Sequence, residues 1–493
     1  MTPTALVLVL ASLTLTDTAP FPGDVGPDGP WCDVINAAQP GQTVTLTPGT
    51  YREPCAITAP GVTVAGALPG QLPVFAYEGD SSNLIDILAD DVTLSFLEFG
   101  PSAPGVDAVK IKSGDRTRVH DCVFRQIGGI SIAANTQDSH GIFIRGNIFR
   151  DLMATAIYLG CHGGKDQCAA RAVTVSRNWI DGVVSSGVGY GVQLKLDSTA
   201  TIEGNVIANT QGPGIMVYGA AESDASIVVT RNLVVGSTTA AAIELGGGPA
   251  RVTNNVVVGG AEGGIYSYDY QDRGMVDNIA VIANSVVGEG GAALRISDAW
   301  VAPKNVRLVA NAAWQRTGTA SALPPVPDGL LFSDNVDCAD PSLCWVDAAN
   351  RDFWPVPDGP LAAGYTQLIP GDSLPVDWCS FARTAPPTIG ALQLLGGVGP
   401  GPLPLMLKQS CPAPAVDTPE VPTAREVDPD SDLGGGSAST GEPADGSETL
   451  ASDTGGCGAS PRPQAPLALL AFIFMTFFHE ICRRTSQKQA QRR

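Results

Sequence analysis

The sequence predicts an all-β fold, a parallel β-helix in which short strands coil around one core. The main evidence is a phrase of alternating apolar residues, then Asn, then two more apolar residues, which recurs between residues 139 and 314. Its asparagines are spaced by roughly 23 to 31 residues, a period that is typical of solenoids. The asparagines are Asn147, Asn178, Asn205, Asn232, Asn255, Asn284 and Asn311.

A second phrase, a small residue followed by apolar alternation, comes after the first in most repeats. It occupies residues 156–159, 191–195, 214–218, 242–245 and 264–268. Both phrases have the period of two that indicates strands, and no helical period lies between them. Each repeat is therefore expected to form one coil of short strands, and successive coils are expected to stack.

The asparagine column has two physical explanations. Asn tolerates the left-handed backbone conformation that is needed where one strand turns into the next. Stacked Asn side chains also hydrogen-bond to one another along a column. The alignment places Cys122 at the base of the column and Leu97 one coil earlier. Cys122 is thus expected to be a buried apolar wall residue and not a nucleophile.

Residues 1–19 are expected to be a secretory signal peptide, because residues 4–15 are apolar and small residues follow. Export agrees with the 11 cysteines of the chain, since disulfides form in oxidising compartments. Spacing along the sequence suggests four disulfides. They are Cys32–Cys55, Cys161–Cys168, Cys338–Cys344 and Cys379–Cys411.

Two regions of the chain carry a resemblance to a known family. The first contains Pro40-Gly41-Gln42-Thr43-Val44 and Gly49-Thr50-Tyr51, and the second contains Asp352-Phe353-Trp354-Pro355 and Thr388-Ile389-Gly390-Ala391. These phrases resemble the opening and closing segments of secreted right-handed β-helix proteins of the pectin-lyase-like superfamily. The resemblance extends over about residues 31–395.

The resemblance implies a single-stranded right-handed parallel β-helix over residues 20–320 and an irregular C-terminal cap segment over residues 321–411. It does not specify an activity, because the superfamily holds lyases, hydrolases, epimerases and non-catalytic surface proteins. The motifs of polygalacturonases and alginate epimerases are absent from the sequence.

Composition changes abruptly after Cys411. Residues 412–456 form an acidic linker of Pro, Gly, Ser and Thr that is expected to be disordered, since it has almost no large apolar side chain to bury. Residues 457–493 contain a Gly-Cys motif at Cys457, an apolar run over 465–482 that is expected to be a membrane helix, and a basic end.

This tail resembles the sorting signal of myxobacterial surface proteins. The resemblance implies that a sortase-like protease processes the chain, that Cys457 is the processing and lipid-anchoring residue, and that the helix is discarded. The mature protein would then be anchored at the cell surface, on the outer membrane of a Gram-negative bacterium. A retained membrane anchor is the alternative.

Charge restricts the partners of the main body. The linker carries ten acidic residues and one arginine, a net charge of −9, and residues 458–493 carry +5, so residues 1–411 hold −16 of the total −20. A body this acidic repels nucleic acid at long range. Neutral polysaccharides, or acidic ones bridged by Ca²⁺, are easier partners, and no other cofactor is expected.

Alternation in the second phrase predicts which side chains face solvent. Two neighbouring outward columns result. The first is Lys110, Ser131, Tyr158, Gln193, Met216, Glu244, Tyr266 and Arg295. The second is Lys112, Ala133, Gly160, Lys195, Tyr218, Gly246, Tyr268 and Ser297. Loops after these strands, with Asp269, Tyr270 and Arg273 among their residues, are expected to wall a groove.

These columns supply candidate chemistry. Tyr158, Gln193, Tyr266, Tyr268 and Arg295 are the predicted substrate-binding residues, since aromatic faces stack on sugar rings. The opposing interpretation is that such side chains only stabilise an exposed sheet by cross-strand pairing.

Catalysis on this face requires particular pairs of residues. In an elimination, Lys195 would act as base and Tyr218 as acid, provided that burial or a cationic neighbour lowers the pKa of Lys195. In a hydrolysis, Glu244 would need a second carboxylate such as Asp269. The sequence therefore predicts a surface protein that binds polysaccharide, with cleavage as a lyase or a glycoside hydrolase as an open question. The alternative is a non-catalytic adhesin or structural surface solenoid.

Overall fold

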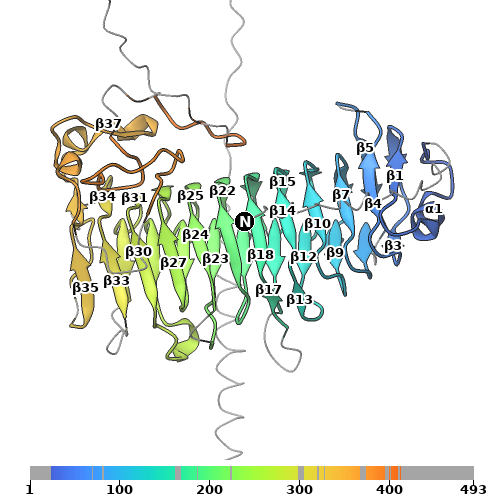
Figure 1. Cartoon of the computed structure of the whole chain (residues 1–493), viewed down its shortest axis with the longest axis horizontal. Coiled ribbons are helices and arrows are strands. Elements are labelled where there is room, and N and C mark those ends of the chain that lie inside the picture. The colour runs from blue at the N-terminus through green and yellow to red at the C-terminus, as the bar shows by residue number, and fades with distance from the viewer. Residues whose placement is uncertain are drawn as a thin grey trace, which may run out of the picture. The chain divides into compact units, whose positions relative to one another are not determined.

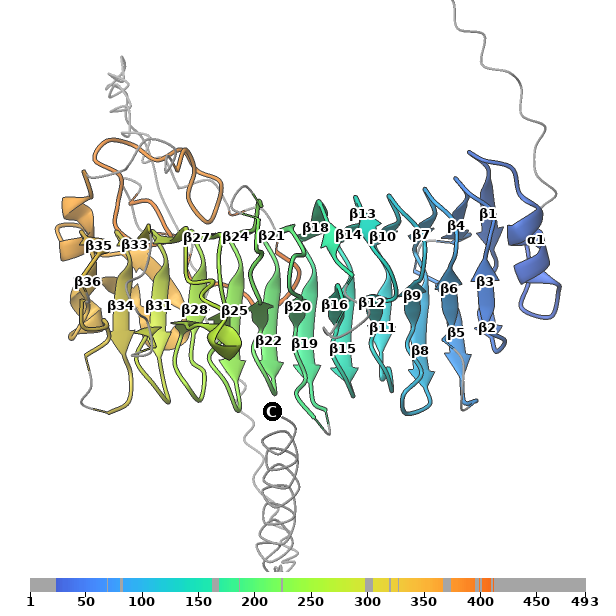
Figure 2. The same cartoon turned by 90° about the horizontal axis from the view of Figure 1, so that it is seen from below.

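The chain forms a solenoid of parallel strands (Figures 1 and 2). The structure, a computed structural model, describes residues 24–411 apart from 69, 80–82, 162–167, 186, 223–224, 298–304, 319–320, 327, 367–373, 395–398, 400 and 409–410. The expected signal peptide, acidic linker, Cys457 and apolar run lie outside these residues. Within the described part, no helix has the length and apolar character to cross a membrane.

Each turn of the solenoid adds one strand to each of three sheets, which we call sheets A, B and C in chain order. Ten turns contribute to all three sheets, and the last two turns contribute only to sheets A and B. All strand pairs in the three sheets are parallel, for example β18 with β21, β19 with β22 and β20 with β23. The predicted parallel β-helix is confirmed.

The three sheets have the following strands. Sheet A comprises β1 (Thr43–Leu46), β4 (Thr63–Gly66), β7 (Thr93–Ser95), β10 (Arg118–His120), β14 (Phe143–Arg145), β18 (Val173–Ser176), β21 (Ala200–Glu203), β24 (Val228–Thr230), β27 (Ala250–Thr253), β30 (Ile279–Ile282), β33 (Val306–Val309) and β35 (Leu330–Ser333). Sheet B comprises β2 (Gly49–Tyr51), β5 (Pro73–Tyr77), β8 (Glu98–Ser102), β11 (Val123–Arg125), β15 (Ile148–Leu152), β19 (Trp179–Val183), β22 (Val206–Thr210), β25 (Leu233–Ser237), β28 (Val256–Val258), β31 (Ser285–Gly288), β34 (Ala312–Gln315) and β36 (Val336–Asp337). Sheet C comprises β3 (Cys55–Ile57), β6 (Ile85–Ile87), β9 (Val109–Ile111), β12 (Ile132–Ala134), β16 (Ile157–Leu159), β20 (Val192–Leu194), β23 (Ile215–Val217), β26 (Ile243–Leu245), β29 (Ile265–Ser267) and β32 (Leu294–Ile296).

A stack of aromatic rings fills the core of the first five turns. Tyr51, Phe75, Phe99, Phe124 and Phe149 hold one inward position of sheet B, and the centres of successive rings are 4.7 to 5.2 Å apart. The helix α1 (Trp31–Ala37) closes this end, and its first residue packs edge-on against the first two rings of the stack. An aromatic residue at the same position of successive coils packs well, because the spacing between neighbouring strands is close to the favourable separation of stacked rings.

The asparagine column forms one continuous hydrogen-bonded ladder inside the corner between sheets A and B. Each asparagine donates both its backbone N–H and its side-chain Nδ2 to the Oδ1 atom of the asparagine one turn later, at 2.8 to 3.1 Å. The ladder therefore satisfies polar groups that would otherwise be buried without partners. Beyond the seven predicted asparagines, Asn335 continues it by one turn.

The asparagines of this corner do not adopt the left-handed backbone conformation, so that part of the prediction was wrong. The residue before it adopts positive φ, as in Arg177 (52°), Gly204 (64°) and Arg231 (56°). The asparagine itself is selected for its amide, because only an amide of this length can donate and accept along the stack. Cys122 lies at the base of the ladder, fully buried, and its backbone N–H donates to Asn147 Oδ1 at 3.0 Å. Burial raises the pKa of its thiol to about 12, as expected for a wall residue.

One predicted outward position is wrong. Ala133, and not Ser131, pairs with Lys110 and Tyr158 in sheet C, so Ala133 belongs to the first outward column. Ser131 instead donates its backbone N–H to Thr155 O, just before the strand begins. The inward positions on either side are all apolar: Ile130, Ile132 and Ala134. Alternation alone therefore could not decide whether Ser131 or Ala133 aligns with Lys110 and Tyr158.

The solenoid continues beyond the predicted boundary at residue 320, because β35 and β36 still pair with sheets A and B. After β36 the chain forms the short antiparallel pair β37 (Trp345–Asp347) and β38 (Asp352–Pro355). The remaining short elements are the parallel pair β13 (Ser139–His140) and β17 (Ala170–Arg171), and the 3₁₀ helices η1 (Tyr270–Asp272), η2 (Pro341–Leu343), η3 (Ala348–Asn350) and η4 (Pro360–Ala363).

The described residues of 374–411, which we call the C-terminal strap, run back along the outside of the solenoid (orange in Figure 1). Asn254 Nδ2 donates to Val376 O at 2.9 Å, and the N–H of Ala391 donates to Ser285 Oγ at 3.0 Å. The strap therefore covers outward-facing apolar residues of sheet B that an uncovered solenoid would expose to water. These residues include Val206, Leu233 and Val256.

The structure contains the four disulfides that the spacing suggests. Cys32–Cys55 joins α1 to sheet C, and Cys161–Cys168 closes the loop after β16. Cys338–Cys344 lies between β36 and β37, and Cys379–Cys411 closes the strap.

Candidate functional site

Six of the nine tyrosines of the chain gather over the outer face of sheet C. Tyr158 and Tyr266 lie on β16 and β29, and the others lie at strand ends or in the adjoining loops. Ring contacts, hydrogen bonds and electrostatic interactions connect them into one surface, which we call the tyrosine face. Its members are Tyr158, Tyr190, Tyr218, Tyr266, Tyr268 and Tyr270.

Lys195 lies among these rings, directly after β20. Its Nζ is 3.7 Å from the centre of the Tyr218 ring and 5.7 Å from the centre of the Tyr158 ring. The residue is only 3% exposed. Burial, with a smaller contribution from the charge of Arg273, lowers the pKa of Lys195 to about 8. The side chain can therefore lose its proton in a pH range where an ordinary lysine stays charged.

A buried polar group lies beside Lys195. Gln193 Nε2 donates to the hydroxyl of Tyr218 at 3.1 Å, and Tyr218 also hydrogen-bonds to Tyr190. Burial raises the pKa of Tyr218 well above its ordinary value, so its hydroxyl stays protonated. Among the described residues, Gln193 Oε1 has no hydrogen-bond partner, although it is buried. A hydroxyl of a bound ligand would satisfy such an acceptor.

Glu244 is the carboxylate at the centre of the face. It accepts hydrogen bonds from the Tyr268 hydroxyl at 3.2 Å and from the Ala241 N–H at 3.3 Å. Burial raises the pKa of Glu244, with a further contribution from Glu262, while these hydrogen bonds lower it. A buried acid with a raised pKa beside a cleft is a common feature of functional sites.

A groove of about 660 Å³ continues the face at its C-terminal end. The Arg295 guanidinium lies 4.3 Å from the centre of the Tyr266 ring, and its Nη1 is 3.6 Å from Glu262 Oε2. Leu323 and Pro324 line the other side of the groove. The groove thus offers both an apolar wall and a cation that lies over an aromatic ring.

The loop after β29 walls the tyrosine face, as predicted. Asp269 Oδ2 accepts from the N–H of Gly274 at 2.8 Å, which closes the loop on itself. Arg273 lies 5.0 Å over the ring of Tyr270, and Tyr270 packs edge-on against Tyr218 with ring centres 4.6 Å apart. Because the Asp269 carboxylate is used within its own loop, it is a poor partner for Glu244 in a hydrolysis.

The predicted residues fall into two neighbouring groups. The first group consists of Lys195, Tyr218, Gln193 and Tyr158. The second group consists of Glu244, Tyr266, Tyr268 and Arg295. Met216 joins them, since its Sδ is 4.0 Å from the Tyr268 hydroxyl.

Sequence reasoning missed Tyr190 and the electrostatic effect of Arg273. Tyr190 precedes β20, at a position that the two outward columns do not include. Its hydrogen bond to Tyr218, like the interaction between Arg273 and Lys195, joins residues of different turns. No local pattern of residues marks either contact.

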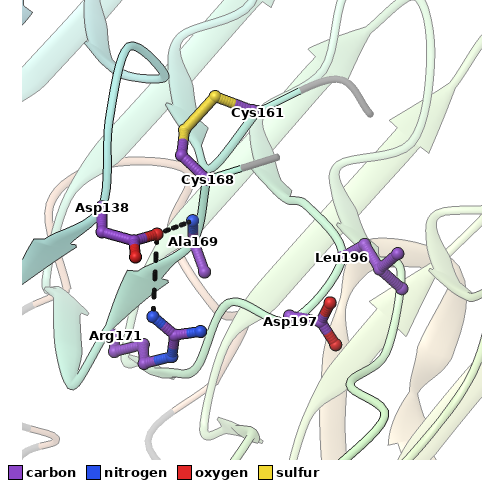
Figure 3. A pocket seen from close by; sticks show the side chains of 7 residues that line it. All are labelled: Asp138, Cys161, Cys168, Ala169, Arg171, Leu196 and Asp197. Carbon is purple, nitrogen blue, oxygen red and sulfur yellow. Dashed lines mark hydrogen bonds and ion pairs between the residues drawn. A yellow bond between two sulfur atoms is a disulfide. The ribbon is translucent and has the colours of Figure 1, made fainter. Parts of the chain in front are cut away.

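A smaller pocket of about 170 Å³ lies beside the Cys161–Cys168 disulfide (Figure 3). Asp138 accepts from the N–H of Ala169 at 2.8 Å and lies 3.7 Å from Arg171. Asp197 accepts from the N–H of Ala221 at 2.8 Å. These contacts satisfy the charged groups of the pocket and hold the loop ends together, so the pocket has a structural explanation.

No group of three or more His, Cys, Asp or Glu side chains in the described part of the chain is arranged to hold a metal ion. The expected role of Ca²⁺ as a bridge to acidic polysaccharides stays a prediction.

Residues 107–286 match the model of the family described as the right handed beta helix region. This match and the strand topology define the class of protein, a parallel β-helix. A search of curated proteins found no match.

Several solved β-helix structures show weak similarity. The A-module of the mannuronan C-5 epimerase AlgE6 from Azotobacter vinelandii is 13% identical, with a TM-score of 0.38, and the alignment covers 62% of this chain and 94% of that one. A polysaccharide lyase of family PL6 from Pseudopedobacter saltans is 12% identical, with a TM-score of 0.37 and coverage of 64% and 92%. The catalytic unit of a GH87 α-1,3-glucanase from Streptomyces thermodiastaticus is 15% identical, with a TM-score of 0.38 and coverage of 62% and 65%. Similarity this weak carries no information on reaction or substrate.

Proposed function

We propose that the protein binds a polysaccharide along the tyrosine face of sheet C. The observation that carries the proposal is the concentration there of six of the nine tyrosines, together with Lys195 and Arg295. Tyrosine combines a flat apolar ring with a polar hydroxyl, which suits the apolar faces and hydroxyl groups of sugar rings.

The dimensions of the face favour a polymer over a single sugar. Outward positions run in register from Tyr158 on β16 to Arg295 on β32, five strand steps apart. Neighbouring strands are about 4.8 Å apart, so this row extends over roughly 24 Å. Within this row Arg295 is exposed and Tyr158, Glu244 and Tyr266 are partly exposed, whereas Gln193 and Met216 are buried beneath their neighbours.

The proposal is tested by measuring the binding of the chain to a panel of neutral and acidic polysaccharides, with and without Ca²⁺. Tyr266→Ala should weaken binding at least about tenfold, because it removes a partly exposed ring of the row and the support of Arg295. Phe96→Ala is the matched control, since Phe96 is 46% exposed but lies at the corner between sheets A and B. Equal effects of the two substitutions, or no binding on the panel, would leave a structural surface solenoid as the better account.

Elimination chemistry is a second candidate function, and Lys195 is the observation that favours it. An elimination needs a base to remove a proton and an acid to protonate the leaving oxygen. Lys195 with a pKa of about 8 is a usable base, and Tyr218 keeps the proton that an acid must donate. Binding without product formation would identify the face as a recognition surface only.

We also propose that the protein is exported and anchored at the cell surface through Cys457. Four disulfides support export, because such bonds persist in oxidising compartments. The anchoring rests on the sequence of the tail, which lies outside the described residues. Cys457→Ala should abolish processing and surface display, whereas Cys122→Ala should not. Unchanged display of the Cys457→Ala variant would contradict the sorting signal.

A further inference from the structure

A second polar pocket lies at the corner between sheets A and B, where the C-terminal strap meets the solenoid. Its volume is about 200 Å³. Three consecutive turns of the solenoid, those of β18, β21 and β24, supply one wall and the strap supplies the other. The lining residues are Arg177, Glu203, Gly204, Arg231, Cys379, Ser380 and Lys408.

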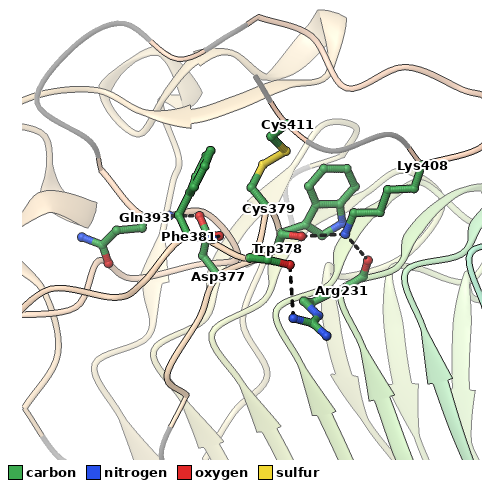
Figure 4. The surroundings of a disulfide bond; sticks show 9 residues. Arg231, Asp377, Trp378, Cys379, Phe381, Gln393, Lys408 and Cys411 are labelled. Atoms are coloured by element: carbon green, nitrogen blue, oxygen red, sulfur yellow. Dashed lines mark hydrogen bonds between the residues drawn. A yellow bond between two sulfur atoms is a disulfide. The ribbon is translucent and has the colours of Figure 1, made fainter. Parts of the chain in front are cut away.

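Lys408 reaches into this pocket from the strap. Its Nζ donates to Trp378 O at 2.6 Å and to Arg231 O at 3.0 Å, and it lies 3.6 Å from the centre of the Trp378 ring. An ammonium group has three N–H donors, and these two hydrogen bonds use two of them. The Cys379–Cys411 disulfide holds the strap on either side of Lys408 (Figure 4).

Two arginines add positive charge from the solenoid wall. Arg231 forms an ion pair with Glu203, the one carboxylate that lines the pocket, and its Nη1 lies 3.3 Å from Ser380 Oγ. Across residues 24–411 as far as they are described, the Arg177 guanidinium donates no hydrogen bond and forms no ion pair. All five of its N–H donors are therefore free to bind a ligand.

We propose that this pocket binds one compact oxyanion group, a sulfate or a phosphate, between Arg177, Arg231 and Lys408. The lining residues carry three cationic groups and one carboxylate, within a body whose net charge is strongly negative. Glu203 pairs with Arg231 and compensates one of the three cations, so a bound anion would neutralise positive charge that remains. Guanidinium groups pair with tetrahedral oxyanions through two parallel hydrogen bonds, and a lysine adds a point charge.

The pocket should couple anion binding to protonation of Lys408. Burial, and the nearby charges of Arg231 and Arg177, lower the pKa of Lys408 to about 7, while Asp377 and Glu203 oppose this shift. A bound anion favours the charged ammonium, so binding should take up protons near neutral pH. Affinity should therefore fall as the pH rises above about 7, where Lys408 is neutral in the unliganded protein.

The test is calorimetric titration of the full-length chain with inorganic sulfate and inorganic phosphate, at constant ionic strength in a chloride buffer. Arg177→Gln should weaken binding at least about tenfold, the effect of one charged hydrogen bond. Arg177 is exposed, so this variant should fold normally, and thermal unfolding checks that it does. Arg52→Gln is the matched control, because Arg52 is an exposed arginine outside the pocket.

A pH series from 6 to 9 uses sulfate, since sulfate does not titrate in this range. Loss of affinity with rising pH in the wild-type chain, reduced in Lys408→Gln, would support the role of Lys408. The absence of saturable binding of either ion would overturn the proposal, as would equal weakening by Arg177→Gln and Arg52→Gln.

The source of the anion is distinguished by titrating glucose 6-sulfate and glucose 6-phosphate beside the inorganic ions. Tighter binding of a sugar ester would show that the pocket takes the anionic group of a saccharide. Tighter binding of the inorganic ion would show a site for the free anion. Either result supports the oxyanion pocket and leaves the proposal for the tyrosine face to its own test, because the two sites share no residue.

Discussion

The ammonium group of Lys195 lies 3.7 Å from the centre of the Tyr218 ring, and both residues are almost fully buried. The ring stabilises the charged form of the lysine, whereas burial favours the neutral form. Burial is the larger effect, since the pKa is lowered to about 8. The two residues predicted for an elimination therefore meet in space, in protonation states that suit a base and an acid.

Lys195→Met provides the test of elimination chemistry. If Lys195 is the base, the rate of formation of unsaturated product should rise as the pH increases through about 8, because only the neutral amine accepts a proton. The substitution should then lower this rate by about 100-fold or more. Absorbance of the unsaturated product over a range of pH measures the effect.

Lys110→Met is the matched control, because Lys110 lies on the same face of sheet C but forms an ion pair with Asp107 at 2.9 Å. A rate that is insensitive to Lys195→Met would contradict the assignment of the base.

Glu244→Gln should change how stability depends on pH. Burial raises the pKa of Glu244 above its ordinary value of 4.5, so the folded chain binds this proton more tightly than the unfolded chain does. The contribution of Glu244 to the free energy of unfolding should therefore fall as the pH rises from 4.5 through the folded-state pKa. Glutamine does not titrate, so the variant should lose this dependence and gain stability relative to wild type as the pH rises.

Thermal unfolding at pH 5 and pH 8 measures this difference. Glu53→Gln is the control, since Glu53 is exposed. Parallel shifts of wild type and Glu244→Gln over this pH range would show that Glu244 is not responsible.

Asn205→Leu should break the asparagine ladder. Asn205 Nδ2 donates to Val175 O and Asn232 Oδ1, both at 2.9 Å, and its Oδ1 accepts from Asn178. Leucine would leave these buried groups without partners, so we expect the free energy of unfolding to fall by about 1 to 3 kcal/mol. Chemical denaturation measures the loss.

Thr201→Leu, at an outward position one strand earlier in the same turn, should cost less than about 0.5 kcal/mol. Equal stability of the Asn205→Leu variant and wild type would contradict the structural role of the ladder.

Replacing Cys379 and Cys411 together by serine should loosen the C-terminal strap. The disulfide closes a segment of 32 residues, so its removal should lower the free energy of unfolding by about 2 to 4 kcal/mol. Because the strap covers apolar residues of sheet B, the variant should also bind more of a hydrophobic dye. The paired substitution of Cys338 and Cys344, which close a segment of 6 residues, should have a smaller effect. Dye binding equal to that of wild type would show that the strap stays in place without its disulfide.

Local patterns in the sequence predicted the parts of the fold that repeat. The asparagine column, the buried position of Cys122 and the outward positions of Tyr158, Gln193, Glu244, Tyr266 and Arg295 follow from a period that every coil shares. Identical positions stack in a solenoid, because each coil contacts only its neighbours. Where alternation permitted two registers, as at Ser131 and Ala133, the prediction was wrong.

The amino-acid sequence by itself therefore determined the class of fold, seven asparagines of its ladder, its cysteine pairs and most of the row of side chains on sheet C. Only the tertiary structure decided the approach of Tyr190 and Arg273 to Lys195, the path of the strap and the pocket around Lys408. The physical reason is distance along the chain. A repeat places residues through contacts one turn away, whereas the contact between Lys408 and Arg231 joins residues 177 positions apart and follows from no local period.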